Sequence, residues 1–249
     1  MKFIKHCYKM LQIQMIHLLS FIWSKEFQIQ RLDKVLILSP HPDDEMIGCA
    51  GLIQKLLKQR KEVYVLMVTG GENAWDSSLI DSGELIVKRR ELMMSAAEII
   101  GLPHEYYLHL GWSDGKLYET VNDPEKQHEL AHIIHSIKPS IILLPHPFEL
   151  SEDHKDLNST LFNALKIREQ KIKVFNYWVH SIKPLRGFLL GWKKSLIVSL
   201  NKDEHQIKLR ALDAYVKPLT YFGKPISGNF YKALLYLMKW NKELFFEAK

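Results

Sequence analysis

The sequence predicts an α/β fold in which a mostly parallel sheet is covered by helices on both faces. Short apolar runs, such as Val-Leu-Ile-Leu at 35–38 and Ile-Ile-Leu-Leu at 141–144, have the length and composition of buried strands. Longer segments between such runs have helical periodicity, as in the recurrence of Leu85, Leu92 and Ala96. Strands and helices therefore alternate along the chain, which favours parallel strands joined by helices.

Each element is bounded by polar or turn-forming residues. Strands are expected at residues 34–39, 63–69, 106–110, 140–144 and 173–179, and helices at residues 46–58, 83–100, 125–138 and 156–166. This order gives a Rossmann-like sheet and brings the ends of its first and fourth strands together. Ligands of such sheets bind at the carboxyl ends of the strands.

Composition is that of an ordinary soluble enzyme domain. The chain has 249 residues, of which 47% are hydrophobic and 25% charged, so it can bury one large core. Its two cysteines exclude a disulfide framework and a zinc finger. The net charge is +6, but there is no recognisable nucleic-acid motif, so we do not expect DNA or RNA as a partner. A basic surface would also suit an anionic lipid or glycan.

The most informative motif is Ser-Pro-His-Pro-Asp-Asp-Glu at residues 39–45, where the first strand passes into a helix. A hydrolytic metal site needs two or three protein ligands, an open position and a carboxylate base. His41 with one of Asp43 and Asp44 could bind a divalent metal, while the other carboxylate stays unliganded as the base. The alternative is a helix N-cap cluster, because acids are favourable at that end of a helix.

A second candidate group follows the fourth strand. Pro145 and Pro147 end that strand, and a polar loop over residues 149–155 carries His154 to the same edge as the first motif. His154 is a candidate metal ligand, with a solvated loop histidine as the alternative. His146, near the strand end, could supply a further imidazole, although a partly exposed loop histidine is an equal alternative.

These residues resemble the PIG-L/LmbE-like family of metal-dependent N-acetylglucosamine deacetylases over roughly residues 32–220. The segments that carry the resemblance are the motif at 39–45, Val68–Glu72, Arg89–Gly101, Asp114, Asp153-His154 and Lys208–Tyr215. One departure is Ser151, which stands where the family usually has the first histidine of His-x-Asp-His. That histidine is the one aimed at the substrate carbonyl.

The resemblance implies a hydrolase that removes the acetyl group from an N-acetylated amino sugar, in a glycoconjugate or glycolipid, and releases acetate. The implied roles are Zn²⁺ ligation by His41, Asp44 and His154, base catalysis by Asp43, and sugar binding by Arg89 and Asp114. A helix-surface arginine and a turn aspartate are the alternatives for the last two. Because of Ser151, we expect His146 to act as a second catalytic residue that stabilises the oxyanion, with His180 as a competing candidate.

Two other functions are compatible with the same residues. The zinc site could act on the amide of another small N-acetyl metabolite. Alternatively, the chain could be a non-catalytic relative that binds metal and glycan, since Ser151 replaces the usual imidazole. Release of acetate separates an enzyme from a binding protein.

The termini lie outside the resemblance. Residues 1–31 are expected to form an amphipathic segment, and residues 32–249 a single deacetylase domain with a C-terminal helical extension over 231–246. The apolar run at 10–23 is too short and too polar for a membrane span and lacks a cleavage site for a signal peptide. We expect a cytoplasmic protein whose terminal helices pack on the domain or contact the cytoplasmic face of a membrane.

Overall fold

The computed structural model describes residues 2–167, 169, 171–180 and 194–248, with side-chain placement from residue 7 onward. Within them, one eight-stranded sheet has the order β1-β7-β8-β6-β5-β2-β3-β4. The strands are β1 (Lys25–Glu26), β2 (Lys34–Ser39), β3 (Glu62–Thr69), β4 (Tyr107–Trp112), β5 (Ile141–Pro145), β6 (Lys173–Tyr177), β7 (Ser195–Ser199) and β8 (Lys242–Glu247). Neighbours pair in parallel except β8, which runs antiparallel to both β6 and β7.

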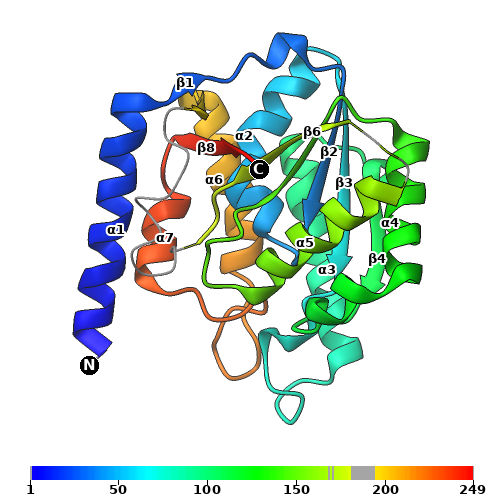
Figure 1. The fold of residues 1–249 in the computed structure, drawn as a ribbon. Coiled ribbons are helices and arrows are strands. Elements are labelled where there is room, and N and C mark those ends of the chain that lie inside the picture. Colours follow the sequence, from blue (N-terminus) through cyan, green and yellow to red (C-terminus); the bar gives the residue numbers. More distant parts are fainter. Residues whose placement is uncertain (1, 168, 170, 181–193, 249) are drawn as a thin grey trace.

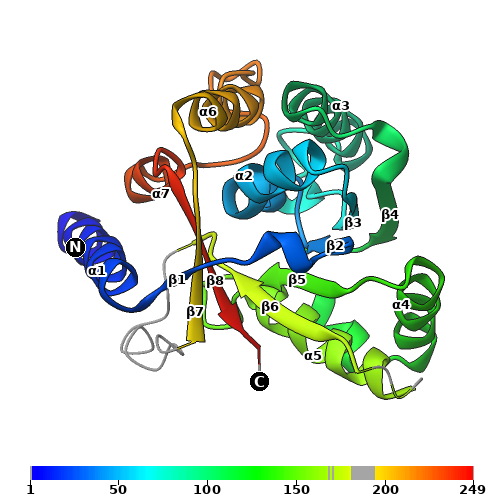
Figure 2. The same cartoon turned by 90° about the horizontal axis from the view of Figure 1, so that it is seen from above.

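Helices cover both faces of this sheet (Figures 1 and 2). They are α1 (Lys2–Trp23), α2 (Asp44–Lys58), α3 (Ser82–Ile100), α4 (Pro124–Ile137), α5 (Glu152–Ile167), α6 (Lys202–Val216) and α7 (Lys232–Met238). One core lies between the sheet and α1, α2, α3, α6 and α7, and a second lies between the sheet and α4 and α5. The predicted α/β fold with a mostly parallel sheet is confirmed.

Two helices begin earlier than the sequence pattern predicts, and both differences affect the candidate site. Helix α2 begins at Asp44 rather than at residue 46, and α5 begins at Glu152 rather than at residue 156. The predicted polar loop over 149–155 was therefore wrong in its second half. His154 lies in the first turn of α5, where the helix backbone fixes its direction.

A buried ion pair fixes α2 against the C-terminal half of the chain. Lys208 of α6 donates to Glu243 of β8 at 2.7 Å and to the carbonyl of Ile47 at 2.8 Å. Glu243 also accepts the amides of Gly51 and Leu52 at 2.7 and 2.8 Å. These bonds satisfy the charges that burial would otherwise penalise, and they hold the helix whose first residue, Asp44, faces the site.

The termini differ from the predicted pattern in one respect. The C-terminal segment forms a helix only as far as Met238, after which β8 pairs with the sheet. At the other end, α1 lies beside α7 and buries Ile13 and Ile16, while Leu18 and Phe21 remain exposed (Figures 1 and 2). None of the described helices combines the length and the apolar character that crossing a bilayer requires. The division into residues 1–31 and 32–249 stays a prediction.

Candidate active site

The loop between β2 and α2 holds Asp43 in an unusual backbone conformation. Its φ of 128° with ψ of −28° is a region that residues with a side chain rarely adopt, so other contacts must stabilise it. The Asp43 amide donates to Glu45 Oε2 at 3.2 Å. Glu45 is itself fixed, because it accepts from the hydroxyls of Ser39 at 3.0 Å and Tyr215 at 2.9 Å. The last residue of the motif is thus a buried anchor for the loop.

Arg89 of α3 anchors the same loop from the other side. Its Nη2 donates to the carbonyl of Pro42 at 2.6 Å, and its Nη1 donates to the carbonyl of Gly71 at 2.8 Å. The same guanidinium lies 3.5 Å from Asp43 Oδ2. Arg89 lines the cleft, but its two terminal nitrogens already have protein acceptors. Its contact with a sugar therefore stays a prediction, while its contacts with the loop are visible.

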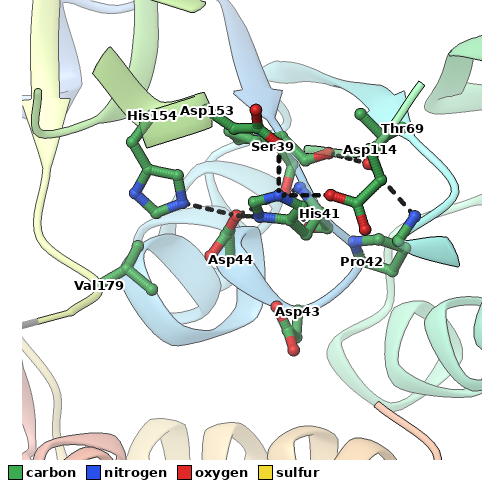
Figure 3. A network of polar contacts seen from close by, with 12 residues as sticks. Ser39, His41, Pro42, Asp43, Asp44, Thr69, Asp114, Asp153, His154 and Val179 are labelled. Carbon is green, nitrogen blue, oxygen red and sulfur yellow. Dashed lines mark hydrogen bonds and ion pairs between the residues drawn. The ribbon is translucent and has the colours of Figure 1, made fainter. Parts of the chain in front are cut away.

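The three predicted metal ligands converge. His41 Nδ1 lies 3.1 Å and His154 Nε2 lies 3.2 Å from the same oxygen, Asp44 Oδ2 (Figure 3). All three offer ligand atoms within 4.8 Å of one another. Asp44 Oδ1 is buried without a hydrogen-bond partner, and the 3.2 Å approach of the buried His154 Nε2 to Asp44 Oδ2 does not have the geometry of a hydrogen bond. Burying polar atoms without partners costs free energy, which a bound cation would offset. Two imidazole nitrogens and a carboxylate are ligands typical of zinc, so this set of donors fits a divalent metal.

A second grouping of possible ligands surrounds the other nitrogen of His41. His41 Nε2 lies 3.2 Å from both Asp114 Oδ1 and Asp153 Oδ2. In the same way, His154 Nδ1 lies 2.7 Å from Glu149 Oε2. A metal-binding histidine usually has a carboxylate or carbonyl on its second nitrogen, which fixes the ring and its tautomer. We therefore interpret Asp114, Asp153 and Glu149 as groups that orient the ligands.

Electrostatics of the cluster are consistent with this interpretation. Burial alone would lower the pKa of His154, but Asp44 and Glu149 raise it to about 9. Burial likewise opposes a proton on His41, whose neighbouring carboxylates nevertheless raise its pKa well above the ordinary value. Burial would raise the pKa of Asp44, but both imidazoles hold it well below its usual range. A divalent cation would compete with these protons for the same nitrogens.

Asp43 lies to one side of this cluster (Figure 3). No hydrogen bond of its carboxylate to His41, Asp44 or His154 is found in the described part of the chain. Burial raises the pKa of Asp43 to about 8, although Arg89 opposes the shift. A carboxylate whose pKa lies near neutrality can accept and return a proton, as a general base must.

The structure brings His180, rather than His146, to the cluster. His180 follows β6, and its Nε2 lies 3.9 Å from Asp44 Oδ1. Its ring stacks on that of His154, with centroids 5.5 Å apart. Burial is the main cause that lowers its pKa, to about 3, so the ring is neutral and can donate from one nitrogen.

His146 lies elsewhere, which corrects its predicted place in the catalytic group. Its amide donates to the carbonyl of Tyr177 at 2.9 Å, which extends the pairing of β5 with β6 by one residue. Its ring packs against Phe148 and Phe246, and Nδ1 accepts from the Phe148 amide at 3.1 Å. It lines a separate cavity of about 340 Å³. The backbone pairing at the strand end therefore directs this imidazole away from the metal ligands.

The cluster opens into a cleft of about 270 Å³. One wall of the cleft carries the cluster, and the other, here called the second wall, is formed by residues 227–234, which the sequence did not indicate as part of the site. From the predicted set, the cleft is lined by His41, Asp43, Asp44, Arg89, Asp114 and His180, and from the C-terminal part of the chain by Ser227, Gly228, Asn229, Phe230, Tyr231 and Leu234. The hydroxyl of Ser227 is buried without a partner. No motif marks residues 227–234, so only the tertiary fold reveals their place in the site.

Comparison with known proteins identifies the same region. The family model for PIG-L, described as GlcNAc-PI de-N-acetylase, matches residues 36–165. Diacetylchitobiose deacetylase of Thermococcus kodakarensis is 30% identical in an alignment 187 residues long, which covers 72% of this chain and 67% of that protein. A probable N-acetyl-alpha-D-glucosaminyl L-malate deacetylase 2 of Bacillus subtilis is 29% identical in an alignment 189 residues long, which covers 74% of this chain and 82% of that protein.

Solved structures agree at the level of the fold. The N,N'-diacetylchitobiose deacetylase from Pyrococcus horikoshii superposes with a TM-score of 0.56 at 24% identity, over 75% of this chain and 70% of that one. The deacetylase of the A40926 pseudoaglycone superposes with a TM-score of 0.63 at 14% identity, over 86% of this chain and 96% of that one.

Proposed function

Because this chain belongs to the PIG-L family and is a hydrolytic N-deacetylase, we propose that it removes the acetyl group from an N-acetylated amino sugar. The proposed reaction depends on zinc. The observation that carries the proposal is the meeting of His41 Nδ1, Asp44 and His154 Nε2 around one buried point, with Asp43 unliganded beside it. That is the division of roles that metal-assisted amide hydrolysis needs.

The zinc ion would be held by His41, Asp44 and His154. When bound, it supplies Lewis-acid chemistry that activates a water molecule and polarises the amide carbonyl. The carboxylates of Asp153 and Glu149 keep the second nitrogen of each imidazole engaged, which would leave the other nitrogen of each ring to bind the ion. These residues therefore provide both the ligands and their orientation.

Asp43 is proposed as the base. It accepts a proton from the attacking water, whose oxygen forms a bond to the acetyl carbon. When the bond between that carbon and the sugar nitrogen breaks, Asp43 returns the proton to the leaving amine, and the products are acetate and a free amino sugar. Glu45 and Arg89 hold the strained loop that places this carboxylate in the cleft.

His180 is proposed as the donor to the oxyanion. The neutral ring lines the cleft, and its Nε2 lies 3.9 Å from Asp44 Oδ1 of the proposed ligand cluster. A donor aimed at the developing charge lowers the barrier of acyl transfer. His180 would thus supply the imidazole that Ser151 lacks, which favours an active enzyme over the binding-protein alternative.

The names of the two relatives point to both neutral and anionic amino sugars as candidate substrates. The named substrate of the archaeal relative is a neutral disaccharide, whereas malate, in the name of the Bacillus relative, is a dicarboxylate. An amide of another N-acetyl metabolite is the remaining alternative.

Acetate release tests the proposal. The zinc-loaded protein is incubated with N-acetylglucosamine glycosides and with simple N-acetyl amines, and acetate is measured enzymatically. We expect release from the sugars, and loss of that release in Asp43→Asn with zinc retained. If acetate came only from non-sugar amides, the substrate class would be wrong. If the Asn variant kept full turnover, the base would be another group.

A further inference from the structure

The side of helix α1 that faces away from the molecule is apolar, although a surface helix normally turns its apolar side toward the core. With about 3.6 residues per turn, one arc of about 100° on this helix carries exposed side chains without charge. They are Cys7, Leu11, Gln14, Leu18, Phe21 and Ile22, here called the outer face of α1. Gln12 and Ser20 are buried on the inward side instead. Helix α1 lies at the outer edge of the molecule, so its outer face is turned to solvent (Figures 1 and 2).

The exposed apolar area of this face is large. Leu11, Leu18, Phe21 and Ile22 are 64, 60, 78 and 56% exposed. Since a large apolar residue has about 200 Å² of surface, these side chains leave roughly 500 Å² of apolar area in contact with water. A patch of that size is at the upper end of what monomers expose, and such patches mark interaction sites. Tyr8 and Tyr236 of the neighbouring α7 extend the surface toward the roughly 800 Å² that each partner contributes to a typical protein interface.

The outer face of α1 also has the spacing of a seam between paired helices. Successive members of the seam are alternately four and three residues apart, in the order Cys7, Leu11, Gln14, Leu18 and Phe21. Helices that pack side by side interlock with this heptad spacing. Burial of Ile13 and Ile16 already holds α1 on the domain, so a partner would bind a preformed surface and would not have to order the helix.

Gln14 favours a second copy of the chain over a lipid bilayer as the partner. It lies at the middle of the seam, where a bilayer would take its amide out of water without offering a hydrogen-bond partner. An amide has both donors and an acceptor, so two Gln14 side chains can bond to each other across a two-fold axis. A helix that lies on a membrane also typically carries Lys or Arg beside its apolar face, and residues 10–23 include neither.

On these grounds we propose that the outer face of α1 binds the same face of a second copy of this chain, about a two-fold axis near Gln14. Lys242, whose Nζ lies 5.8 Å from the ring centroid of Phe21, would lie at the polar rim of this contact. Helix α1 precedes the family-matched residues 36–165, so family membership does not specify the contact. The contact does not depend on the proposed deacetylation.

Sedimentation equilibrium of the full chain at about 1–100 µM tests the association. Since an interface of this size can give micromolar affinity, we expect twice the chain mass at the highest concentration. Leu18→Glu should raise the Kd of association at least about 30-fold, because it places a carboxylate within the apolar contact. The matched control is Val87→Glu, because Val87 of α3 is 57% exposed but lies on another helix. The control should associate like the wild type, and circular dichroism should show wild-type helix content in both variants.

Substitutions of Gln14 test the two-fold symmetry. Gln14→Glu and Gln14→Lys should each raise the Kd of association at least about tenfold when measured alone, because like charges would meet across the axis. An equimolar mixture of the two variants should recover the association, because opposite charges would then meet. A partner other than this chain would not produce that pattern.

Three outcomes would overturn the proposal. The first is an equal mass for wild type and Leu18→Glu, whatever that mass is, and the second is a mixture of the Gln14 variants that associates no better than either variant alone. Flotation with vesicles of phosphatidylcholine and phosphatidylserine gives the third. If the wild-type chain stayed monomeric but bound these vesicles, and Leu18→Glu did not bind them, the outer face of α1 would be assigned to a membrane. None of these measurements uses acetate release, so failure of the contact and failure of the proposed function are distinguishable.

Discussion

The two sides of the cleft are built in different ways. On the side of β2, β4 and β5, functional groups are fixed by protein partners; both nitrogens of His41 and both oxygens of Glu45 are engaged. On the side of residues 227–234, the hydroxyl of Ser227 is buried without a partner, and Tyr231 is approached by Lys9 from a distant helix. The first side is organised before substrate arrives, and its unpartnered Asp44 Oδ1 belongs to a proposed zinc ligand, whereas the second side keeps the Ser227 hydroxyl, which substrate can satisfy.

This difference indicates that one side of the cleft supports catalysis and the other supports substrate recognition. The family-matched residues 36–165 include the fixed side and end well before the second wall. Preorganised donors and ligands are what lower a reaction barrier, so they belong to the shared chemistry of the family. The Ser227 hydroxyl, which lies outside the family-matched residues and has no protein partner, is suited to recognising one particular substrate. Substitutions on the first side should therefore lower zinc content or turnover, whereas substitutions on the second wall should weaken substrate binding.

The largest effect is expected from the fixed side. His154→Ala removes a proposed zinc ligand and leaves the buried carboxylates of Asp44 and Glu149 without their imidazole partner. Zinc content should fall close to zero, and turnover should fall by more than about 100-fold. Metal analysis after gel filtration measures the first and acetate release the second. The control is His146→Ala, which should keep its zinc because that ring faces another cavity.

Asp43→Asn should separate catalysis from metal binding. The amide keeps the size of the carboxylate but cannot accept a proton at neutral pH, so turnover should fall by about 10²- to 10⁴-fold while zinc content is unchanged. Parallel metal analysis and steady-state kinetics measure both quantities. Loss of zinc together with turnover would instead place Asp43 among the ligands.

His180→Ala tests the proposed oxyanion donor. Turnover should fall by about 10²-fold with zinc retained, because one donor to the developing charge is removed. His146→Ala should have nearly wild-type kcat. The opposite ranking of these two variants would return His146 to the mechanism and show that the observed ring positions are not those of the active enzyme.

A smaller effect is expected at the anchor of the strained loop. Tyr215→Phe removes the hydroxyl that donates to Glu45 at 2.9 Å, so one buried acceptor loses a partner. The free energy of unfolding should fall by about 1–3 kcal/mol, and kcat should fall several-fold with little change in KM. Chemical denaturation and kinetics measure the two. A stability loss with wild-type kcat would mean that the anchor is structural only.

The smallest effect is expected on the second wall. Ser227→Ala removes a hydroxyl that has no protein partner, so folding stability should change by no more than about 0.5 kcal/mol or should rise slightly. Substrate binding should weaken several-fold because the substrate loses one hydrogen bond, and this should be seen in KM rather than kcat. A clear loss of stability would contradict the view that this wall is completed by substrate.

The fixed side of the site could be predicted from the sequence because its signals are local. A buried strand followed by His41, Asp43 and Asp44 specifies both the element and the residue types, and the parallel order of strands brings His154 to the same edge. The direction in which a side chain points is not determined by the local sequence alone. The placement of His146 depends on pairing with β6 and on packing against Phe246, a residue far along the chain.

The second wall lacked any such signal. Ser227 and Tyr231 belong to a turn-rich segment that leads into the short helix α7, which packs beside the distant helix α1. Apolar periodicity over 231–246 favoured one long helix, but Phe245 and Phe246 pack better as strand residues in the core, and tertiary packing overrides such a preference. Lys9 lies more than two hundred residues before Tyr231, and no pattern links the two.

One measurement tests the metal site most directly: anomalous scattering at the zinc edge from crystals of the zinc-loaded protein. The two groupings of acids and imidazoles share His41 but use opposite nitrogens of its ring. We predict a single peak bounded by His41 Nδ1, Asp44 and His154 Nε2, with Asp43 unliganded. A peak between His41 Nε2, Asp114 and Asp153 would contradict the assignment of ligands and base together.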